Sequence, residues 1–358
     1  MNIVQVFPGK IWGGAEQYVF DLGKELAARG NSVRYVSRDS AVVTSRLREA
    51  GVGFVSLPFS WSLDLRTISK LAEVIRDADV LNIHSVRFVP TALLAKKKSG
   101  SKAKIVLTHH EAHRTPVNPL FRHFFRQLHK VIFVSDMARR SWCGANRWFP
   151  EEKCVVVHNS IPSVSGTGSG ESLREKYDIP ETVPLIVFSG RVRKSKGCGV
   201  LIEALGRIAD HAFAMVFLGA CHPAGYAEKL MKAAETGGIA DRIHFFGFTP
   251  NARTLMKQAD IGVAPSLVRE SFCLTNIEFQ QQGVAIVTSN NGGQPEYVTD
   301  GVTGLLVNPG DSVQLAEAIA RLLEDEAFRK RVASAGNEYF NSHLSYGRFV
   351  DKIMEVYS

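Results

Sequence analysis

The chain has 358 residues, of which 45% are hydrophobic and 22% are charged, and its formal net charge at pH 7 is +8. The length favours two domains over one, and the composition is that of a globular protein with a sizeable apolar core. Because no apolar run approaches the roughly 18 residues of a membrane span, the sequence predicts no transmembrane helix. The opening residues MNIVQVFPGK are typical of a strand rather than of a secretory signal.

The positive charge lies in the first half of the chain. Residues 1–165 carry a net charge of +11 and residues 166–358 a net charge of −3. This asymmetry indicates either a solvated basic face or an anionic partner for the first half, such as phosphate, a membrane surface or nucleic acid. The cysteines show no Cys-x-x-Cys pattern and favour reduced thiols in the cytoplasm over a disulfide framework or a zinc site. They are Cys143, Cys154, Cys198, Cys221 and Cys273.

Short apolar runs alternate with helical patterns through the first half. The candidate strands are residues 2–7, 32–37, 53–59, 80–84, 104–109, 131–135 and 154–158. In the segment 15–30, Val19, Leu22 and Leu26 share one helical face, and Gly30 is expected to end the helix. Strands that are apolar on both faces and separated by helices predict a parallel sheet built from βαβ units.

The alternation stops in the Ser/Gly-rich segment 163–170, which we interpret as an interdomain linker. It then restarts, with candidate strands at residues 184–190, 213–219, 242–248, 259–266, 284–289 and 303–309. We therefore expect two Rossmann-like domains, at residues 1–162 and 163–340, and a helix at 341–358 that packs back on the first domain. Ligands are expected at the carboxyl ends of the strands, and the cleft between the domains is the expected active site.

A cationic loop follows the first strand of the second domain. In SGRVRKSKG, the guanidinium of Arg191 can bind two phosphate oxygens, and Lys196 adds a point charge beside the N–H groups of a helix start. Gly190 and Gly197 let the backbone approach a ligand closely. The loop therefore predicts a diphosphate site, with a merely basic surface loop as the alternative. The residue order of a P-loop is absent.

Two carboxylates flank a later strand-to-helix junction. Glu270 is expected in the loop after ADIGVAPS, and Thr275 or Asn276 is expected to cap the helix, with Glu278 in its first turn. A carboxylate in a first turn stabilises the helix end, and it is also a natural acceptor for the two vicinal hydroxyls of a ribose. The residue types alone leave both interpretations open.

Three motifs, GRVRKSKG, ESFCLTNIE and NNGGQPEYVTDGVTGLLVNPGD, resemble the family 4 (group 1) glycosyltransferases in order and spacing. GGAE at 13–16, VLNIHS and KIVLTHHEAH extend the resemblance over nearly the whole chain. It implies the GT-B fold, an α/β architecture with two Rossmann-like parallel-sheet domains facing a central cleft. It also implies a retaining transferase that uses a nucleotide diphosphate sugar, with a UDP-sugar favoured, and that needs no metal or other cofactor.

The resemblance also assigns residues. Arg191 and Lys196 are expected to hold the donor diphosphate, Glu278 the ribose and Glu270 the sugar hydroxyls, and His110 is expected beside the transferred sugar. The expected catalytic residues are His110, Arg191, Lys196 and Glu270. The expected donor site comprises Gly13, Gly14, Gly190, Arg191, Lys196, Phe248, Glu270, Ser271, Phe272, Cys273, Leu274, Thr275 and Glu278. Many family members have Gly-Phe-Gly where this chain has Ser271-Phe272-Cys273, which leaves the donor sugar open.

Fixed cations and amide dipoles would stabilise the negative charge that builds on the departing diphosphate. Retention through a nucleophile needs two carboxylates about 5 Å apart. The first domain offers no evident nucleophile, so the resemblance implies front-face substitution, in which the leaving phosphate takes the proton of the acceptor. The alternative for His110 is a structural role at the edge of the core, with its ring nitrogens hydrogen-bonded to backbone groups.

Two further patterns resemble metal sites. The Asp77-Ala-Asp79 pattern precedes a strand and so lies away from the ligand-binding edge. HHEAH at 109–113 lacks the spacing of His-Glu-x-x-His and has no second cluster to complete the ligands. Neither pattern predicts a metal site.

The segment NPLFRHFFRQLHK, residues 118–130, spaces its apolar side chains in helical fashion among Arg122, Arg126 and Lys130. Such a helix packs on its own sheet or, together with AKKKSGSKAK, binds the anionic inner face of the cytoplasmic membrane. On the second interpretation the acceptor is a cell-envelope glycan such as lipopolysaccharide or a lipid-linked saccharide.

Other functions are weighed against this one. A sugar-nucleotide epimerase shares the expected architecture. A nucleic-acid-binding protein would show a reading motif, and a dehydrogenase would show Gly-x-Gly-x-x-Gly after the first strand; neither is present. A non-catalytic sugar-binding protein leaves the cationic loop unexplained.

Overall fold

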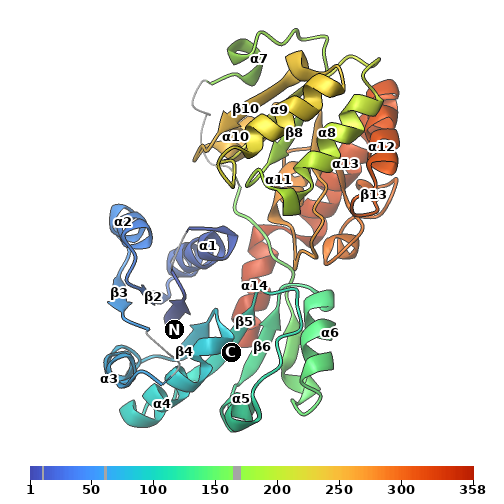
Figure 1. Ribbon diagram of the computed structural model, residues 1–358. Coiled ribbons are helices and arrows are strands. Elements are labelled where there is room, and N and C mark those ends of the chain that lie inside the picture. Colours follow the sequence, from blue (N-terminus) through green and yellow to red (C-terminus); the bar gives the residue numbers. More distant parts are fainter. Residues whose placement is uncertain (10–11, 60–62, 164–170) are drawn as a thin grey trace. The chain divides into compact units, whose positions relative to one another are not determined.

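The computed structural model describes residues 1–9, 12–59, 63–163 and 171–358 (Figure 1). The chain divides into two compact units. Unit 1 comprises Met1–Asn159 and Tyr346–Ser358, and unit 2 comprises Ser160–Ser345. Each unit is a parallel sheet with helices packed on it. The segment that we interpret as a linker lies, apart from residue 163, outside the described residues.

The strands of unit 1, over its described residues, lie in the order β3-β2-β1-β4-β5-β6-β7, and every neighbouring pair is parallel. The strands are β1 (Asn2–Phe7), β2 (Ser32–Arg38), β3 (Phe54–Leu57), β4 (Val80–Ile83), β5 (Lys104–His109), β6 (Lys130–Phe133) and β7 (Cys154–Val156). The helices include α1 (Gly14–Ala28), α2 (Ala41–Glu49), α3 (Leu65–Val74), α4 (Val89–Ser99), α5 (Arg122–Arg126), α6 (Asp136–Ala145) and α14 (Tyr346–Tyr357). The order reverses between β1 and β4, which in parallel α/β sheets is where ligands bind.

Side chains alternate along these strands, so each strand contributes to two cores. Val4 and Val6 belong to the buried cluster that contains residues of α3, α4 and α6. Ile3 and Phe7 belong to the opposite cluster, which contains residues of α1 and α14. The last helix of the chain, α14, thus packs on the sheet of unit 1 through Phe349, Val350, Ile353 and Tyr357.

The strands of unit 2, over its described residues, lie in the order β10-β9-β8-β11-β12-β13, again all parallel. The strands are β8 (Leu185–Ser189), β9 (Ala214–Leu218), β10 (Ile243–Gly247), β11 (Ile261–Ala264), β12 (Ala285–Ser289) and β13 (Leu305–Val307). The helices include α7 (Leu173–Lys176), α8 (Cys198–Arg207), α9 (Tyr226–Thr236), α10 (Ala252–Met256), α11 (Leu274–Gln281), α12 (Ser312–Glu324) and α13 (Glu326–His343). Here the order reverses between β8 and β11.

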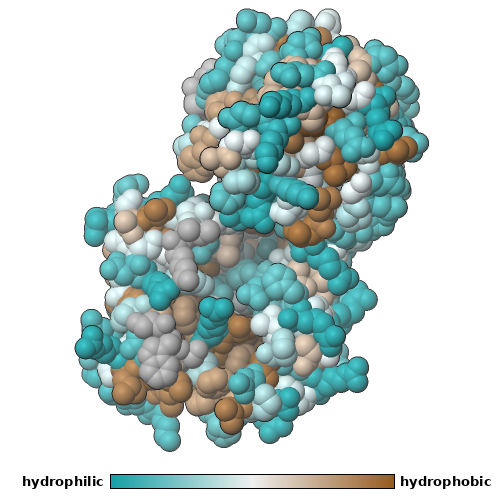
Figure 2. Space-filling model, in the orientation of Figure 1, coloured by the Kyte–Doolittle hydropathy of each residue, from teal (hydrophilic) through white to brown (hydrophobic). Residues whose placement is uncertain are grey.

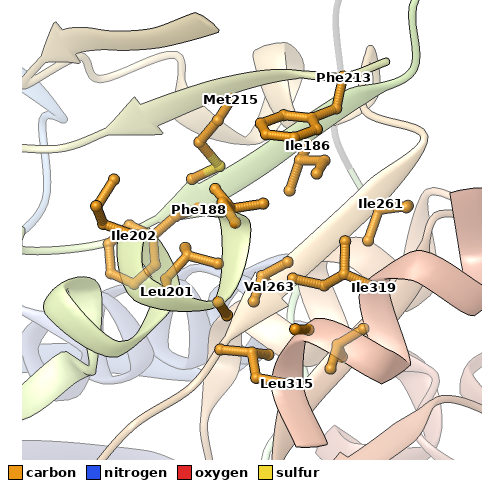
Figure 3. Close-up of a cluster of buried hydrophobic side chains, with 14 of the residues drawn as sticks. Ile186, Phe188, Leu201, Ile202, Phe213, Met215, Ile261, Val263, Leu315 and Ile319 are labelled. Carbon is orange, nitrogen blue, oxygen red and sulfur yellow. The ribbon is translucent and has the colours of Figure 1, made fainter. Parts of the chain in front are cut away.

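Figure 3 shows how the core of unit 2 is made. Ile186 and Phe188 of β8 point to the same side of the sheet as Val263 of β11, and there they meet Leu201 of α8 and Leu315 of α12. On the surface, polar and charged residues cover most of the face seen in Figure 2, with apolar residues scattered among them.

Each strand predicted from the sequence is present, with ends within two residues of the prediction. The first helix also ends as predicted, because Gly30 follows its last turn with a φ of +82°. The α/β architecture is therefore confirmed.

The helix expected at 118–130 is present but shorter than expected, and it packs on the sheet of its own unit through Phe125 and Leu128. The segment forms a 3-10 turn at Pro119–Phe121 and a five-residue helix, α5, and β6 already begins at Lys130. Leu120, expected on the apolar face, is 82% exposed, whereas Phe125 and Leu128 are buried. Pro119 is compatible with the first position of this helical segment, and the helix ends at Arg126 because β6 begins only four residues later, at Lys130.

Candidate active site

Loops from three strands of unit 2 meet at the carboxyl edge of its sheet. The loop after β8 carries Arg191 and Lys196, the loop after the neighbouring β11 carries Glu270, and the loop after β12 carries Gly292. The reversal of strand order between β8 and β11 separates the helices that follow these strands and opens this edge to a ligand.

Lys196 and Glu270, predicted as separate parts of the donor site, form an ion pair. The Nζ atom of Lys196 lies 2.6 Å from Oε1 of Glu270, and the hydroxyl of Ser266 donates to the same oxygen at 2.7 Å. The backbone N–H of Leu267 donates to the carbonyl of Ser195 at 3.0 Å, which ties the β11 loop to the β8 loop. The side chains of Lys196 and Glu270 remain 30% and 19% exposed, so a ligand can reach the pair.

Arg191 is exposed, and its guanidinium makes no ion pair or hydrogen bond with the described residues. The neighbouring Arg193 instead donates to the hydroxyl of Ser195 within its own loop. Because Lys196 already has a carboxylate partner, Arg191 is the member of the predicted Arg191–Lys196 pair whose full charge is available to an anion; Lys194 of the same loop is also exposed.

Two glycines allow these loops to touch. A Cβ atom on Gly197, whose φ is +75°, would lie 1.9 Å from the carbonyl oxygen of Pro265 in the β11 loop. A Cβ atom on Gly292, whose φ is +70°, would lie 2.2 Å from the carbonyl oxygen of Glu270, and the N–H of Gly293 donates to that oxygen at 2.9 Å. Only glycine fits at either position. The sequence analysis gave no role to Ser266, Gly292 or Gly293, although the Asn-Gly-Gly at 291–293 is a turn signal that indicated a tight backbone here.

The start of α11 differs from the prediction. The cap residue is Cys273, not Thr275 or Asn276, and Glu278 lies in the second turn rather than the first. The two expected caps have other partners: Thr275 donates to the carbonyl of Ser189, and Asn276 donates to the hydroxyls of Thr288 and Tyr297. The chain reverses earlier than expected, so the helix begins one residue before Thr275.

The side chains of the Ser271–Leu274 stretch do not converge on one point. Phe272 is buried against Tyr297, with ring centroids 4.6 Å apart, and Tyr297 donates to the carbonyl of Cys273 at 3.1 Å. Burial raises the pKa of the Cys273 thiol to about 12, so this thiol is neutral. Ser271 and Leu274 are half-buried. The backbone N–H groups at the start of α11 are suited to bind an anion.

The outer residues of the predicted donor site lie on other elements. The carboxylate of Glu278 lies 3.9 Å from Nε of Arg253 on α10. Phe248 directly follows β10 and is 70% exposed, at the same carboxyl edge. Its open ring is suited to stacking on a flat ligand group such as a base. Gly190, at the end of β8, has a φ of +138°.

In unit 1, Gly13 and Gly14 form the start of α1, at the carboxyl end of β1. Gly13 is the cap residue, and its N–H donates to Oε2 of Glu16 at 3.1 Å. Burial raises the pKa of this carboxyl, partly offset by the backbone hydrogen bonds it accepts. An anion binding at this helix end would compete with Glu16 for the Gly13 N–H.

His110 directly follows β5 and is half-buried. Its Nε2 lies 3.0 Å from Nδ1 of His84, which follows the neighbouring strand β4, and the ring of Tyr18 meets it edge-on with centroids 4.9 Å apart. The partner of His110 is therefore a second histidine, not the backbone. Burial, reinforced by the charge of His109, lowers the pKa of His110 to about 3, so the imidazole is neutral at pH 7.

His109 and His110 point to opposite faces of the sheet. His109, the last residue of β5, is buried against Phe133 and Trp142, whereas His110 packs against Tyr18. Over the described residues, no cluster of three or more His, Cys, Asp or Glu side chains could hold a metal ion. In the Asp-x-Asp pattern, Asp79 accepts from the N–H of Asn2 at 2.7 Å, at the amino edge of the sheet.

Two basic segments of unit 1 each precede a strand: one lies at the end of α4, before β5, and the other lies in α5, before β6. Lys96, Lys97 and Lys98 occupy the last turn of α4, where they offset the negative end of the helix dipole, and β5 follows. Arg122 and Arg126 stack on the ring of Trp148 at 5.3 and 5.8 Å. Within the described part of the chain, no helix has the length and apolar character to cross a membrane.

Two family profiles match the chain. One, described as "Glycosyl transferases group 1", matches residues 169–339, and the other, "Glycosyltransferase Family 4", matches residues 12–163. The chain belongs to the family 4 (group 1) glycosyltransferases. The resemblance seen in the sequence motifs is thus confirmed over both units.

Relatives of this glycosyltransferase have diverse names. It is 25% identical to N-acetyl-alpha-D-glucosaminyl L-malate synthase of Bacillus anthracis, over 96% of this chain and 93% of that one. It is 27% identical to the phosphatidyl-myo-inositol mannosyltransferase of Mycobacterium leprae, over 96% and 92%.

The fold is shared with solved glycosyltransferase structures. A glycosyltransferase from Rickettsia africae superposes with a TM-score of 0.88 at 22% identity, over 99% of this chain and 97% of that chain. The Anabaena protein HepE in complex with UDP and glucose has a TM-score of 0.82 at 20% identity, over 99% and 98%. These similarities identify the fold as GT-B.

Proposed function

We propose that this glycosyltransferase moves a hexose from a UDP-sugar to a hydroxyl of an anionic cell-envelope acceptor, with retention of configuration and without a metal. The observation that carries the proposal is the edge of unit 2, where the free guanidinium of Arg191 accompanies the Lys196–Glu270 pair. HepE was solved with UDP and with UDP-glucose, which supports a uridine nucleotide as the donor.

In the proposed reaction, the bond between the anomeric carbon and the phosphate oxygen breaks, and its electron pair stays on the diphosphate. Arg191 and Lys196 stabilise the charge that develops there, in the place that a metal ion takes in other transferases. Glu270 accepts hydrogen bonds from sugar hydroxyls while Lys196 holds its carboxylate. The acceptor oxygen bonds to the anomeric carbon on the face that the phosphate leaves, and its proton passes to a phosphate oxygen.

A cavity in unit 1 supports the anionic acceptor. It has a volume of about 160 Å³ and is lined by Val86, Arg87, Pro90, Thr115, Pro116, Val117, Asn118, Phe121 and Phe125. Arg87 is exposed and forms no ion pair with the described residues. L-malate and phosphatidyl-myo-inositol, which appear in the names of two relatives, both carry negative charge. An acceptor such as lipopolysaccharide or a lipid-linked saccharide fits this chemistry.

A thermal-shift panel of UDP-, GDP- and ADP-sugars tests the donor. A donor at 100 times its Kd stabilises the folded chain by about 2.7 kcal/mol, so one class should raise the Tm clearly above the others. Equal shifts for all three, or none, would refute the assignment of the donor.

A product assay separates transfer from the alternative, an epimerase of the same fold. Transfer releases UDP only when an acceptor is present, and NMR of the new glycoside shows whether the anomeric configuration of the donor is retained. An epimerase would instead produce an altered nucleotide sugar without acceptor. Inversion of configuration would contradict the front-face mechanism, and full activity after chelation checks the metal independence.

A further inference from the structure

A chain of buried polar side chains runs beneath α14 and ends at His110. Gln5 of β1, Asn82 of β4 and Thr108 of β5 are fully buried, in a face of the sheet that is otherwise apolar. The hydroxyl of Tyr357, on α14, accepts hydrogen bonds from the amides of Asn82 at 2.7 Å and Gln5 at 3.3 Å. Gln5 and Asn82 are cross-strand neighbours, so one hydroxyl reaches both.

The chain continues from Gln5 to the two histidines. Oε1 of Gln5 lies 2.8 Å from Nε2 of His84, and Nδ1 of His84 lies 3.0 Å from Nε2 of His110. The two imidazole planes differ by only 25°. Tyr18 packs edge-on against both rings and fixes their tilt.

These contacts determine where the protons are. With the Gln5 amide placed as in the structure, its oxygen faces His84 and only accepts, so Nε2 of His84 carries a proton and donates to Gln5. In a neutral imidazole the other nitrogen is then an acceptor, so Nδ1 of His84 receives a proton donated by Nε2 of His110. Burial lowers the pKa of both rings, that of His84 well below its usual value, so both are neutral. His110 is left with a lone pair on Nδ1, which has no protein partner among the described residues.

Packing alone does not require this chain. Apolar side chains of similar volume would fill the same space, and a buried polar group is costly unless every hydrogen bond is made. Residues that orient a functional histidine through its second ring nitrogen are a recurrent use of such groups in proteins.

We infer that Gln5, His84 and Tyr357 are positioning residues, which hold His110 in the tautomer with its proton on Nε2, so that Nδ1 accepts a hydrogen bond from a hydroxyl of the transferred sugar. The inference rests on the proposed function and on the place beside the transferred sugar that the family resemblance implies for His110. Tyr357 supports the relay by accepting from the Gln5 amide nitrogen, which leaves the amide oxygen facing His84.

Nitrogen NMR of the full-length protein labelled with ¹⁵N-histidine tests the relay without substrate, because the ring nitrogen shifts report which nitrogen is protonated. We expect a protonated Nε2 on both His84 and His110 in the wild type. In Gln5→Met and Tyr357→Phe, which keep the volume but remove the hydrogen bonds, we expect a mixture of tautomers at His110. Ile353→Val, on the same face of α14 and buried in the same core, is the matched control and should leave the spectrum unchanged.

Kinetics of the same variants test the consequence. We expect kcat to fall about tenfold in Gln5→Met and Tyr357→Phe, with the KM of the donor unchanged, and to stay near the wild-type value in Ile353→Val. Protonated Nδ1 in the wild type, or unchanged spectra in both variants, would overturn the relay. Altered tautomers with unchanged kcat would instead refute the role of His110 in transfer.

Discussion

Replacing Gly292 with alanine tests whether the β12 loop positions Glu270. The new Cβ atom would lie 2.2 Å from the carbonyl oxygen of Glu270, which is 1.2 Å closer than the 3.4 Å at which ordinary contact begins. The oxygen is a backbone atom and the Cβ atom is rigidly attached to the backbone, so neither can rotate away, and the clash is relieved only if the Glu270 loop or the Gly292 loop moves by about 1 Å. A displacement of this size at a reacting centre can cost about 10²-fold in rate.

Gly283→Ala is the matched control, because it carries the same cost of a left-handed backbone conformation without the clash. Gly283 has the same φ of +70°, but a Cβ atom there would meet nothing within 4 Å. Both substitutions should therefore lower the free energy of unfolding by about 1–2 kcal/mol for the left-handed conformation alone. Gly292→Ala should lose about 1 kcal/mol more if the hydrogen bond from Gly293 to Glu270 breaks.

The assay combines urea unfolding with steady-state transfer from the donor. We expect Gly292→Ala to reduce kcat about 10²-fold and Gly283→Ala to change it less than threefold. Equal kcat values for the two variants would show that the position of Glu270 does not depend on Gly292, and the buttressing role would be refuted.

Three further predictions follow from the same structure. Arg191→Ala should lower kcat by roughly 10²–10³, and Lys194→Ala, which removes an exposed cation from the same loop, should have little effect; similar losses in both would indicate a general charge effect instead of a specific contact. Burial lowers the folded-state pKa values of His84, His109 and His110, to about 4 for His109 and about 3 for His110. Below pH 6.5 the unfolded state therefore binds more protons than the folded state, and the free energy of unfolding decreases as the pH falls. Unfolding at pH 7 and 5.5 should differ by about 1 kcal/mol for each of the three, and a pH-independent midpoint would contradict their neutral burial. Docking on anionic membranes stays a prediction. The protein should sediment with vesicles rich in anionic lipid at low salt and be released from them at high salt. If the protein is absent from the vesicle pellet at low salt, docking is excluded.

The first of these predictions concerns the loop in which sequence and structure differ most in detail. The sequence placed Arg191 and Lys196 together as one anion-binding pair. In the structure only Arg191 is free, because Glu270 and Ser266 come from the β11 loop to engage Lys196. A ligand that binds Lys196 at this edge must therefore compete with Glu270 for it.

Local pattern was sufficient for the architecture. Runs such as residues 104–109 are apolar on both faces and are followed by helical periodicity, and only a parallel sheet covered on both sides buries such strands. Motif spacing then identified the family and the residues at the strand ends. The same reasoning overestimated the length of the helix at 118–130, because the chain already enters β6 at Lys130.

The contacts that make a site were decided only by the tertiary structure. Lys196 and Glu270 are 74 residues apart, and Gln5 and Tyr357 are 352 apart. No local signal links such pairs, because the order of strands in the sheet and the packing of α14 determine which side chains meet. The sequence by itself thus determined the fold class, the family and the candidate residues. Which cation is free, what holds Glu270 and which proton His110 carries depend on distances that exist only in the folded chain.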